Sequence, residues 1–136
     1  AKTAASAVMR YFDTAAVHHH EDEEVDLFPA LIESMAGSDA VCIHEMTAAL
    51  VAEHRVLEAQ WRTLRLALDA IVNAPEVNTH EAGLDPARVT GFVRDYKAHI
   101  TREDDELLPM AARLLDASAI ERIGRAMRER RGITAV

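Results

Sequence analysis

Apolar residues in the middle of the chain recur every three or four positions, and this period constrains the fold more than any other feature. The stripe holds Ile43, Met46, Leu50, Leu57, Trp61, Leu64, Leu68 and Ile71. Because an α-helix has 3.6 residues per turn, such spacing places apolar groups on one helix face. A long helix with one apolar face buries it against other helices. The pattern therefore predicts a helix from about Ala40 to Ala74 that faces a bundle.

Three further helical stretches follow from similar patterns. A first helix is expected from about Lys2 to Met35, with its apolar stripe at Ala5, Val8, Phe12, Ala15 and Leu27. A third begins at Pro86, a residue suited to the first turn of a helix, and carries Val89, Phe92, Tyr96, Leu107 and Met110. A short fourth helix covers about Ala119 to Arg130 and ends at Gly132.

The connections and prolines complete the expected architecture. Gly37 to Asp39 should end the first helix and begin the second, and residues 75–85 form the one long loop. Pro29 and Pro109 should kink their helices, since proline lacks the backbone N–H. With 4% aromatic residues, five Gly and four Pro, the composition also favours helices over an all-β chain. We expect an all-α, up-down antiparallel bundle that forms one domain over residues 1–136.

Charge and hydropathy exclude several classes of function. A net charge of −8 argues against nucleic acid or anionic lipid as the main partner. The C-terminal arginines are read as a solvated helix end; they are Arg122, Arg125, Arg128, Arg130 and Arg131. No apolar run approaches the roughly 20 residues of a membrane span. The start of the chain lacks a signal-peptide pattern and Cys42 has no partner for a disulfide, which together favour the cytoplasm.

Ionisable residues interrupt the apolar stripe of each long helix. His19 and Glu23 stand in the first, His54 in the second, and His99 and Glu103 in the third. A His and a Glu four residues apart share one helix face. The first motif, His-x3-Glu-x5-Pro, recurs in the third helix in the same register to a proline, which makes a chance match a weak explanation.

Burying these groups without a partner would cost several kcal/mol. Imidazole nitrogen and carboxylate oxygen are metal ligands, and bundle interiors host such sites. Helix lengths put His54 level with His19 and Glu23, and the third helix brings its own motif to a similar height. A lone His54 would more often be a core histidine with a satisfied hydrogen bond, but the combination of five residues favours a metal.

Several neighbouring residues are secondary candidates or lie outside the expected site. His20 and Glu24 are rotated about 100° from the main pair and are candidates at the edge, and Asp104 is a weaker alternative to Glu103. Glu21 and Asp22 are read as a solvated face. His44 and His80 are read as structural or exposed. No HExxH, Glu-x-x-His, CxxC, Gly-rich phosphate loop or Gly-x-Ser-x-Gly occurs in the sequence.

Three segments resemble the hemerythrin-like, or HHE cation-binding, family. They are HHHEDEEVDLFPAL from His18, AEHRVLE around His54, and HITREDDELLPMA from His99. The resemblance implies a non-haem, usually di-iron, centre bridged by carboxylates in a four-helix bundle. Family roles include oxygen binding, oxygen or iron sensing, iron handling and stress resistance. The positions that match family ligands are His19, Glu23, His54, His99 and Glu103, with His20 as an extra ligand in some members.

The chain departs from the family pattern in two places. Family members usually carry an earlier helix with one more ligand histidine, whereas this chain opens inside a helix-like stretch. We expect that this helix was removed or is disordered, or that a partner chain, as in a homodimer, fills its place. The second helix also has one inward histidine where oxygen carriers have two. Glu58, four residues after His54, is a candidate replacement ligand.

The leading hypothesis is a centre of iron, as two ions, that binds or senses O2 or another small oxidant, or handles iron. Zinc and manganese are alternative metals. The second hypothesis is an enzyme that reduces peroxide or nitric oxide with the same centre. The third is a helical assembly module with zinc or no metal.

Overall fold

The computed structural model describes residues 2–34, 40–74 and 84–133. This part of the chain is helical and contains no strand. The elements are α1 (Lys2–Arg10), η1 (Tyr11–Ala15), α2 (Ala16–Glu21), η2 (Asp22–Leu27), α3 (Phe28–Ser34), α4 (Ala40–Asn73), α5 (Pro86–Arg102), η4 (Glu103–Leu107), α6 (Leu108–Leu114) and α7 (Ala117–Arg130). The three η elements are π-helical turns, in which the backbone bonds skip one residue more than in an α-helix.

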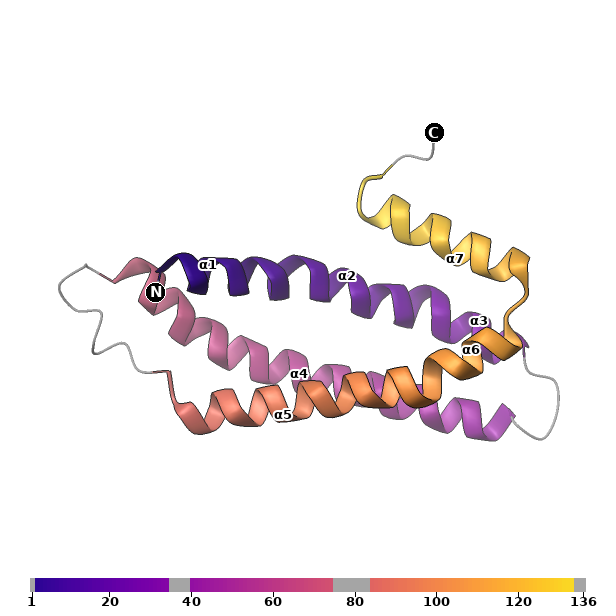
Figure 1. The fold of residues 1–136 in the computed structure, drawn as a ribbon, viewed down its shortest axis with the longest axis horizontal. Coiled ribbons are helices and arrows are strands. Elements are labelled where there is room, and N and C mark those ends of the chain that lie inside the picture. The colour runs from indigo at the N-terminus through magenta and orange to yellow at the C-terminus, as the bar shows by residue number, and fades with distance from the viewer. Residues whose placement is uncertain (1, 35–39, 75–83, 134–136) are drawn as a thin grey trace.

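The elements form four helical stretches that run up and down (Figure 1). The stretch from α1 to α3 runs one way, α4 returns antiparallel to it, and α5 with α6 runs back again. The fourth stretch, α7, folds back over the first and packs against η2. The expected all-α, up-down bundle is confirmed.

Side-chain caps fix the helix ends that the sequence indicated. Asp85 precedes α5 and its carboxylate accepts a hydrogen bond from the amide of Ala87 at 3.0 Å. Asp116 does the same for Ala119 at 2.7 Å, so α7 begins two residues before the expected start. Gly132 adopts a φ of 74°, which ends α7 as predicted. The expected turn at residues 37–39 and most of the expected loop lie outside the described residues.

A wide turn, rather than a break, accommodates each proline. Pro29 and Pro109 have no N–H, and η2 and η4 each end two residues before the proline. In each case the residue before the proline bonds to the glutamate carbonyl five residues back. These bonds run from Phe28 N–H to Glu23 and from Leu108 N–H to Glu103. The repeated Glu-x5-Pro spacing is thus the sequence of a π turn, and Figure 1 shows the bend between α5 and α6.

The turn η1 changes which residues of the first stretch are buried. The expected stripe places Ala15 inside, but Ala15 is exposed and Ala16 is buried. Val8 is also exposed, whereas Ala5 is buried as predicted. A π turn holds more residues than an α turn, so Ala15 rotates outward and Ala16 takes its place. The same rotation carries inward the residue four positions later, His20.

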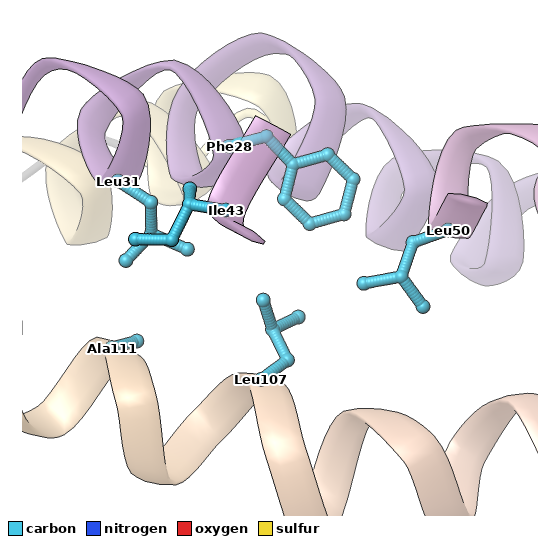
Figure 2. Close-up of a cluster of buried hydrophobic side chains, with 6 residues drawn as sticks. All are labelled: Phe28, Leu31, Ile43, Leu50, Leu107 and Ala111. Carbon is cyan, nitrogen blue, oxygen red and sulfur yellow. The ribbon is translucent and has the colours of Figure 1, made fainter. Parts of the chain in front are cut away.

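The apolar core consists of two clusters with a polar layer between them. One cluster contains Phe28, Leu31, Ile43, Leu50, Leu107 and Ala111, which come from three stretches and converge in Figure 2. The other contains Leu57, Leu64 and Phe92, with Phe12 and Trp61 packed against it. On α4, His54 stands between Leu50 and Leu57. The polar layer therefore lies in the middle of the bundle with apolar packing on both sides.

Candidate metal centre

Four ionisable side chains from three helical stretches meet in this layer. They are Glu23 of η2, His54 of α4, His99 of α5 and Glu103 of η4, and none is more than 6% exposed. Each offers one nitrogen or oxygen atom, and these four atoms lie within 4.8 Å of one another. The structure thus brings together four of the five residues expected to form the site.

The atoms that converge are all potential electron-pair donors. The two Nε2 atoms of His54 and His99 lie 3.1 Å apart. Oε2 of Glu23 lies 3.0 Å from His54 Nε2, and Oε1 of Glu103 lies 2.6 Å from His99 Nε2. Both of these oxygens are buried and make no hydrogen bond of acceptable geometry with the described residues. A cation between them, either a proton or a metal, is needed to stabilise this arrangement.

His19 lies at the outer edge of the cluster rather than inside it. Its side chain is 52% exposed, so the expectation that it is buried was wrong. Its Nε2 atom still lies 2.8 Å from Oε1 of Glu23 and 3.4 Å from Oε2 of Glu103. Each carboxylate therefore directs one oxygen toward His19 and the other toward the buried histidines.

His20 occupies the inner position that the sequence pattern had given to His19. It is buried, and its ring stacks on that of His54 with the centroids 3.9 Å apart. Its Nε2 atom has no hydrogen-bond partner among the described residues. The ring nitrogens of His20, His54 and His99 form a second group within 4.8 Å. His20 lies four residues after Ala16, so the two share one helix face. This spacing identifies His20 as the inward residue only because the π turn places Ala16 inside.

The carboxylates favour protonated imidazoles in the metal-free cluster. Burial opposes a charge on His54, but the adjacent carboxylates of Glu103, Glu23 and Glu24 outweigh burial and raise the pKa of this histidine to about 9. Hydrogen bonds with Glu103 and Glu23 raise the pKa of His19 to about 10. Protons on these two rings therefore offset the carboxylate charge, as a bound metal also would.

Two further groups of the cluster have shifted pKa values: the acid of Glu103 favours its charged form, and the imidazole of His20 favours its neutral form. Burial favours the neutral acid of Glu103, yet the imidazoles of His19, His54 and His99 hold the pKa of this carboxyl well below its usual range. Burial, with the charge of His54 beside it, lowers the pKa of His20. A neutral imidazole and an ionised carboxylate are the forms that bind metals.

Sequence comparison agrees with the geometry. Residues 2–111 match the family described as Hemerythrin HHE cation binding domain. The chain belongs to this family. A Haemophilus influenzae protein described as uncharacterized is 29% identical over 126 residues, which cover 93% of this chain and 67% of that protein. No solved structure matches the chain.

The residues present suit the cation that a hemerythrin domain binds. Buried oxygens without hydrogen bonds, two facing imidazole nitrogens and a set of nitrogen and oxygen donors fit a first-row transition metal. The described residues of this hemerythrin domain thus contain a buried His/Glu cluster able to hold a metal ion.

Glu24 and Glu58, expected as less certain ligands, contact the outer nitrogens of histidines. Oε2 of Glu24 accepts a hydrogen bond from Nδ1 of His54 at 2.9 Å. Oε1 of Glu58 lies 3.2 Å from Nδ1 of His20. Both glutamates lie outside the two groups of converging atoms, and both pair with Arg55. Glu24 and Glu58 each stand four residues after a histidine, His20 and His54, which is why the sequence placed them near the site. The spacing did not indicate that each glutamate of this outer layer would contact the histidine of the other helical stretch.

Asp22 is buried and paired, which corrects the interpretation of this residue as part of a solvated face. It is 4% exposed, and its two oxygens accept hydrogen bonds from Arg130 at 2.5 Å and Arg131 at 2.6 Å. Arg130 also bonds to Asp26 at 2.6 Å. The interpretation of the arginines as a solvated helix end was therefore wrong for Arg130, although Glu21 is half-exposed as expected. The contacts join residues far apart in the chain, so local spacing gave no signal.

A groove of about 580 Å³ leads from the surface to the cluster. His19, Glu23 and Glu103 line its polar part, and α5, α6 and α7 supply its apolar walls. The apolar walls include Ile100, Leu108, Ile120, Ile123 and Met127. Asp104, the weaker alternative to Glu103, also lines the groove but is exposed. His44 is exposed as expected, and His80 lies outside the described residues.

None of the helices in the described ranges is both long enough and apolar enough to cross a membrane.

Proposed function

We propose that this hemerythrin domain binds two iron ions and uses them to bind or sense O2 or another small oxidant. The observation that carries the proposal is the placement of Glu23 and Glu103, each with one oxygen near His19 and the other near the buried imidazoles. Carboxylates in that position are suited to bridge two ions in a helical bundle.

Six side chains would bind the ions, and a seventh would orient one of these ligands. His54, His99 and His20 would serve the inner position, and His19 the outer one; Glu23 and Glu103 would lie between. Glu24 fixes the orientation of His54 through its outer nitrogen. When bound, a pair of iron ions supplies two electrons that O2 or a similar oxidant can accept.

The surrounding apolar groups control access to the centre. The cluster of Leu57, Leu64 and Phe92 closes one end of the polar layer, and that of Leu31, Leu50 and Leu107 closes the other. His19 is the exposed member and faces the groove beside α7. A small ligand would therefore approach from this side, past apolar walls that limit water.

Metal analysis of protein purified without a His-tag column tests the proposal. Protein loaded with Fe²⁺ under nitrogen and then desalted should retain roughly two ions per chain, the number expected for a carboxylate-bridged pair. His54→Ala and Glu103→Ala should lower this number, whereas His44→Ala, an exposed histidine on the same helix, should not. A wild-type protein that retains no iron would overturn the proposal, and unchanged iron in a variant would remove that residue from the site.

Oxygen binding needs a separate measurement. Air added to the iron-loaded protein should change its near-ultraviolet and visible absorption, and removal of oxygen should restore the first spectrum. An unchanged spectrum would leave iron handling as the function.

A second candidate is an enzyme that reduces peroxide or nitric oxide, and the groove supports it. The groove of about 580 Å³ opens at the surface and is lined by Glu23 and Glu103, so peroxide or nitric oxide would reach the centre directly from solution. Steady-state consumption of hydrogen peroxide or nitric oxide by the iron-loaded protein, absent from the His54→Ala variant, would favour the enzyme. Consumption equal to that of free Fe²⁺ would exclude it.

A further inference from the structure

Arg55 of α4 contacts the outer layer of the centre without contacting the cluster itself. Its side chain is 56% exposed and pairs with Glu24 through Nη2. Its other terminal nitrogen, Nη1, donates to both oxygens of Glu58 at 2.8 Å. One guanidinium therefore holds two carboxylates that come from different helical stretches.

These two carboxylates contact the outer nitrogens of two buried histidines. Glu24 accepts from His54 at 2.9 Å, and Glu58 lies 3.2 Å from His20. An ionised carboxylate can only accept hydrogen bonds, so the hydrogen in each contact belongs to Nδ1 of the imidazole. A ring that donates from Nδ1 can offer Nε2 to a metal. The two glutamates thus fix both the plane and the donor atom of His54 and His20.

We propose that Arg55 is a positioning residue for the metal centre, acting through Glu24 and Glu58 on His54 and His20. The inference rests on the proposed function, because it assumes that these imidazoles bind a metal. A planar guanidinium suits the role since its donors reach two carboxylates at once. Lysine carries the same charge, but as a single point, and cannot hold both in one geometry.

The charge of Arg55 makes the proposal distinguishable from a simple electrostatic effect. Removing a positive charge near a metal site strengthens cation binding if only Coulomb forces act. Loss of orientation instead weakens binding, because outer partners of ligating histidines typically contribute about 10- to 100-fold to affinity. Exposed ion pairs contribute little to folding, so stability should change little in either case.

Titration with Co²⁺ under nitrogen is the test, with the visible absorption of the bound ion as the readout. We expect Arg55→Ala to bind Co²⁺ more weakly than the wild type, by up to about 10-fold, the lower end of what a direct partner of a ligating histidine contributes, and to show altered bands. Arg55→Lys should recover part of the affinity. Arg65→Ala is the matched control, since Arg65 lies on the same helix and pairs with Asp13 at 2.9 Å, away from the cluster.

A double-variant cycle shows whether Arg55 acts through the two glutamates. In a Glu24→Gln, Glu58→Gln background, Arg55→Ala should change Co²⁺ affinity far less than it does in the wild type. An equal loss in both backgrounds would overturn the proposed route. Circular dichroism of each metal-free variant checks that the helical fold is retained, and Arg55→Lys provides the comparison if Arg55→Ala is less stable.

The outcomes separate the failure of this inference from that of the proposed function. Wild-type protein that binds no Co²⁺ would contradict both. Wild-type binding with equal or tighter binding by Arg55→Ala would overturn the positioning role alone. An equal loss in Arg65→Ala would also overturn it, because the effect would then not be specific to the contacts of Arg55 with Glu24 and Glu58.

Discussion

Raising the pH should destabilise the metal-free protein while strengthening its affinity for a metal. The carboxylates around His54 raise its pKa from 6.5 to about 9, so the folded state binds this proton more tightly than the unfolded chain. Stability from a raised pKa is fully present below about pH 6.5 and is lost as the pH rises through about 9. The shift corresponds to at most about 3 kcal/mol, and His19 acts in the same direction.

A metal reverses the sign of this pH dependence. Metal and proton compete for the same imidazole nitrogen, so each proton that leaves on binding makes affinity rise tenfold per pH unit. Between about pH 7 and about 9, we expect roughly one to two protons to be released per cluster, from His54 and His19.

Urea unfolding in the presence of a chelator measures the first effect. The free energy of unfolding of the metal-free protein should fall by up to about 3 kcal/mol from about pH 6.5 to about pH 10, and His54→Gln should fall by less. Calorimetric Zn²⁺ titration in buffers of different ionisation enthalpy counts the protons released. Metal-free stability that is constant or rises with pH would refute the reasoning, as would metal binding without proton release.

Two further perturbations test the packing around the site. Asp22→Asn removes the carboxylate held by Arg130 and Arg131, so we expect the free energy of unfolding to fall by about 1–3 kcal/mol and hydrogen exchange in α7 to become faster. Glu121→Gln, on the exposed side of α7, is the control. Equal exchange in the two variants would contradict the proposed anchoring. Leu31→Ala leaves a cavity at a fully buried position and should lower the free energy of unfolding by about 2–5 kcal/mol. Leu66→Ala, on the surface, should change it by less than about 0.5 kcal/mol. Similar losses in the two variants would argue against the assigned core.

The helices were predictable because their signals are local. The stripe on α4 and Pro86 in the first turn of α5 each depend on residues within a few turns of one another. The contact of α7 with η2 was not predictable, since Asp22 and Arg130 are distant in sequence and each resembles an ordinary surface charge. Their pairing exists only after the bundle has brought the two ends together.

The site was predictable in its chemistry and less so in its detail. A buried His-x3-Glu repeat is incompatible with a dry core, so a charged layer could be inferred from the residues alone. The relative burial of His19 and His20 could not, because it depends on one π turn at Tyr11–Ala15 that extends the helix by a fraction of a turn. Regular α-helical spacing points to the first of these histidines, whereas the backbone places the second one inside.

The two wide turns beside the prolines also constrain how this chain can change over time. Val25 in η2 is 60% exposed, and its side chain would tolerate most replacements. Deleting Val25 would rotate the preceding part of the first stretch by about 100° relative to Phe28 and Leu31. Glu23 and His20 would then face different neighbours. Loss of one unremarkable surface residue would therefore disable the centre as thoroughly as loss of a ligand. We expect chain length across these turns to be under stricter selection than the identity of most residues within them.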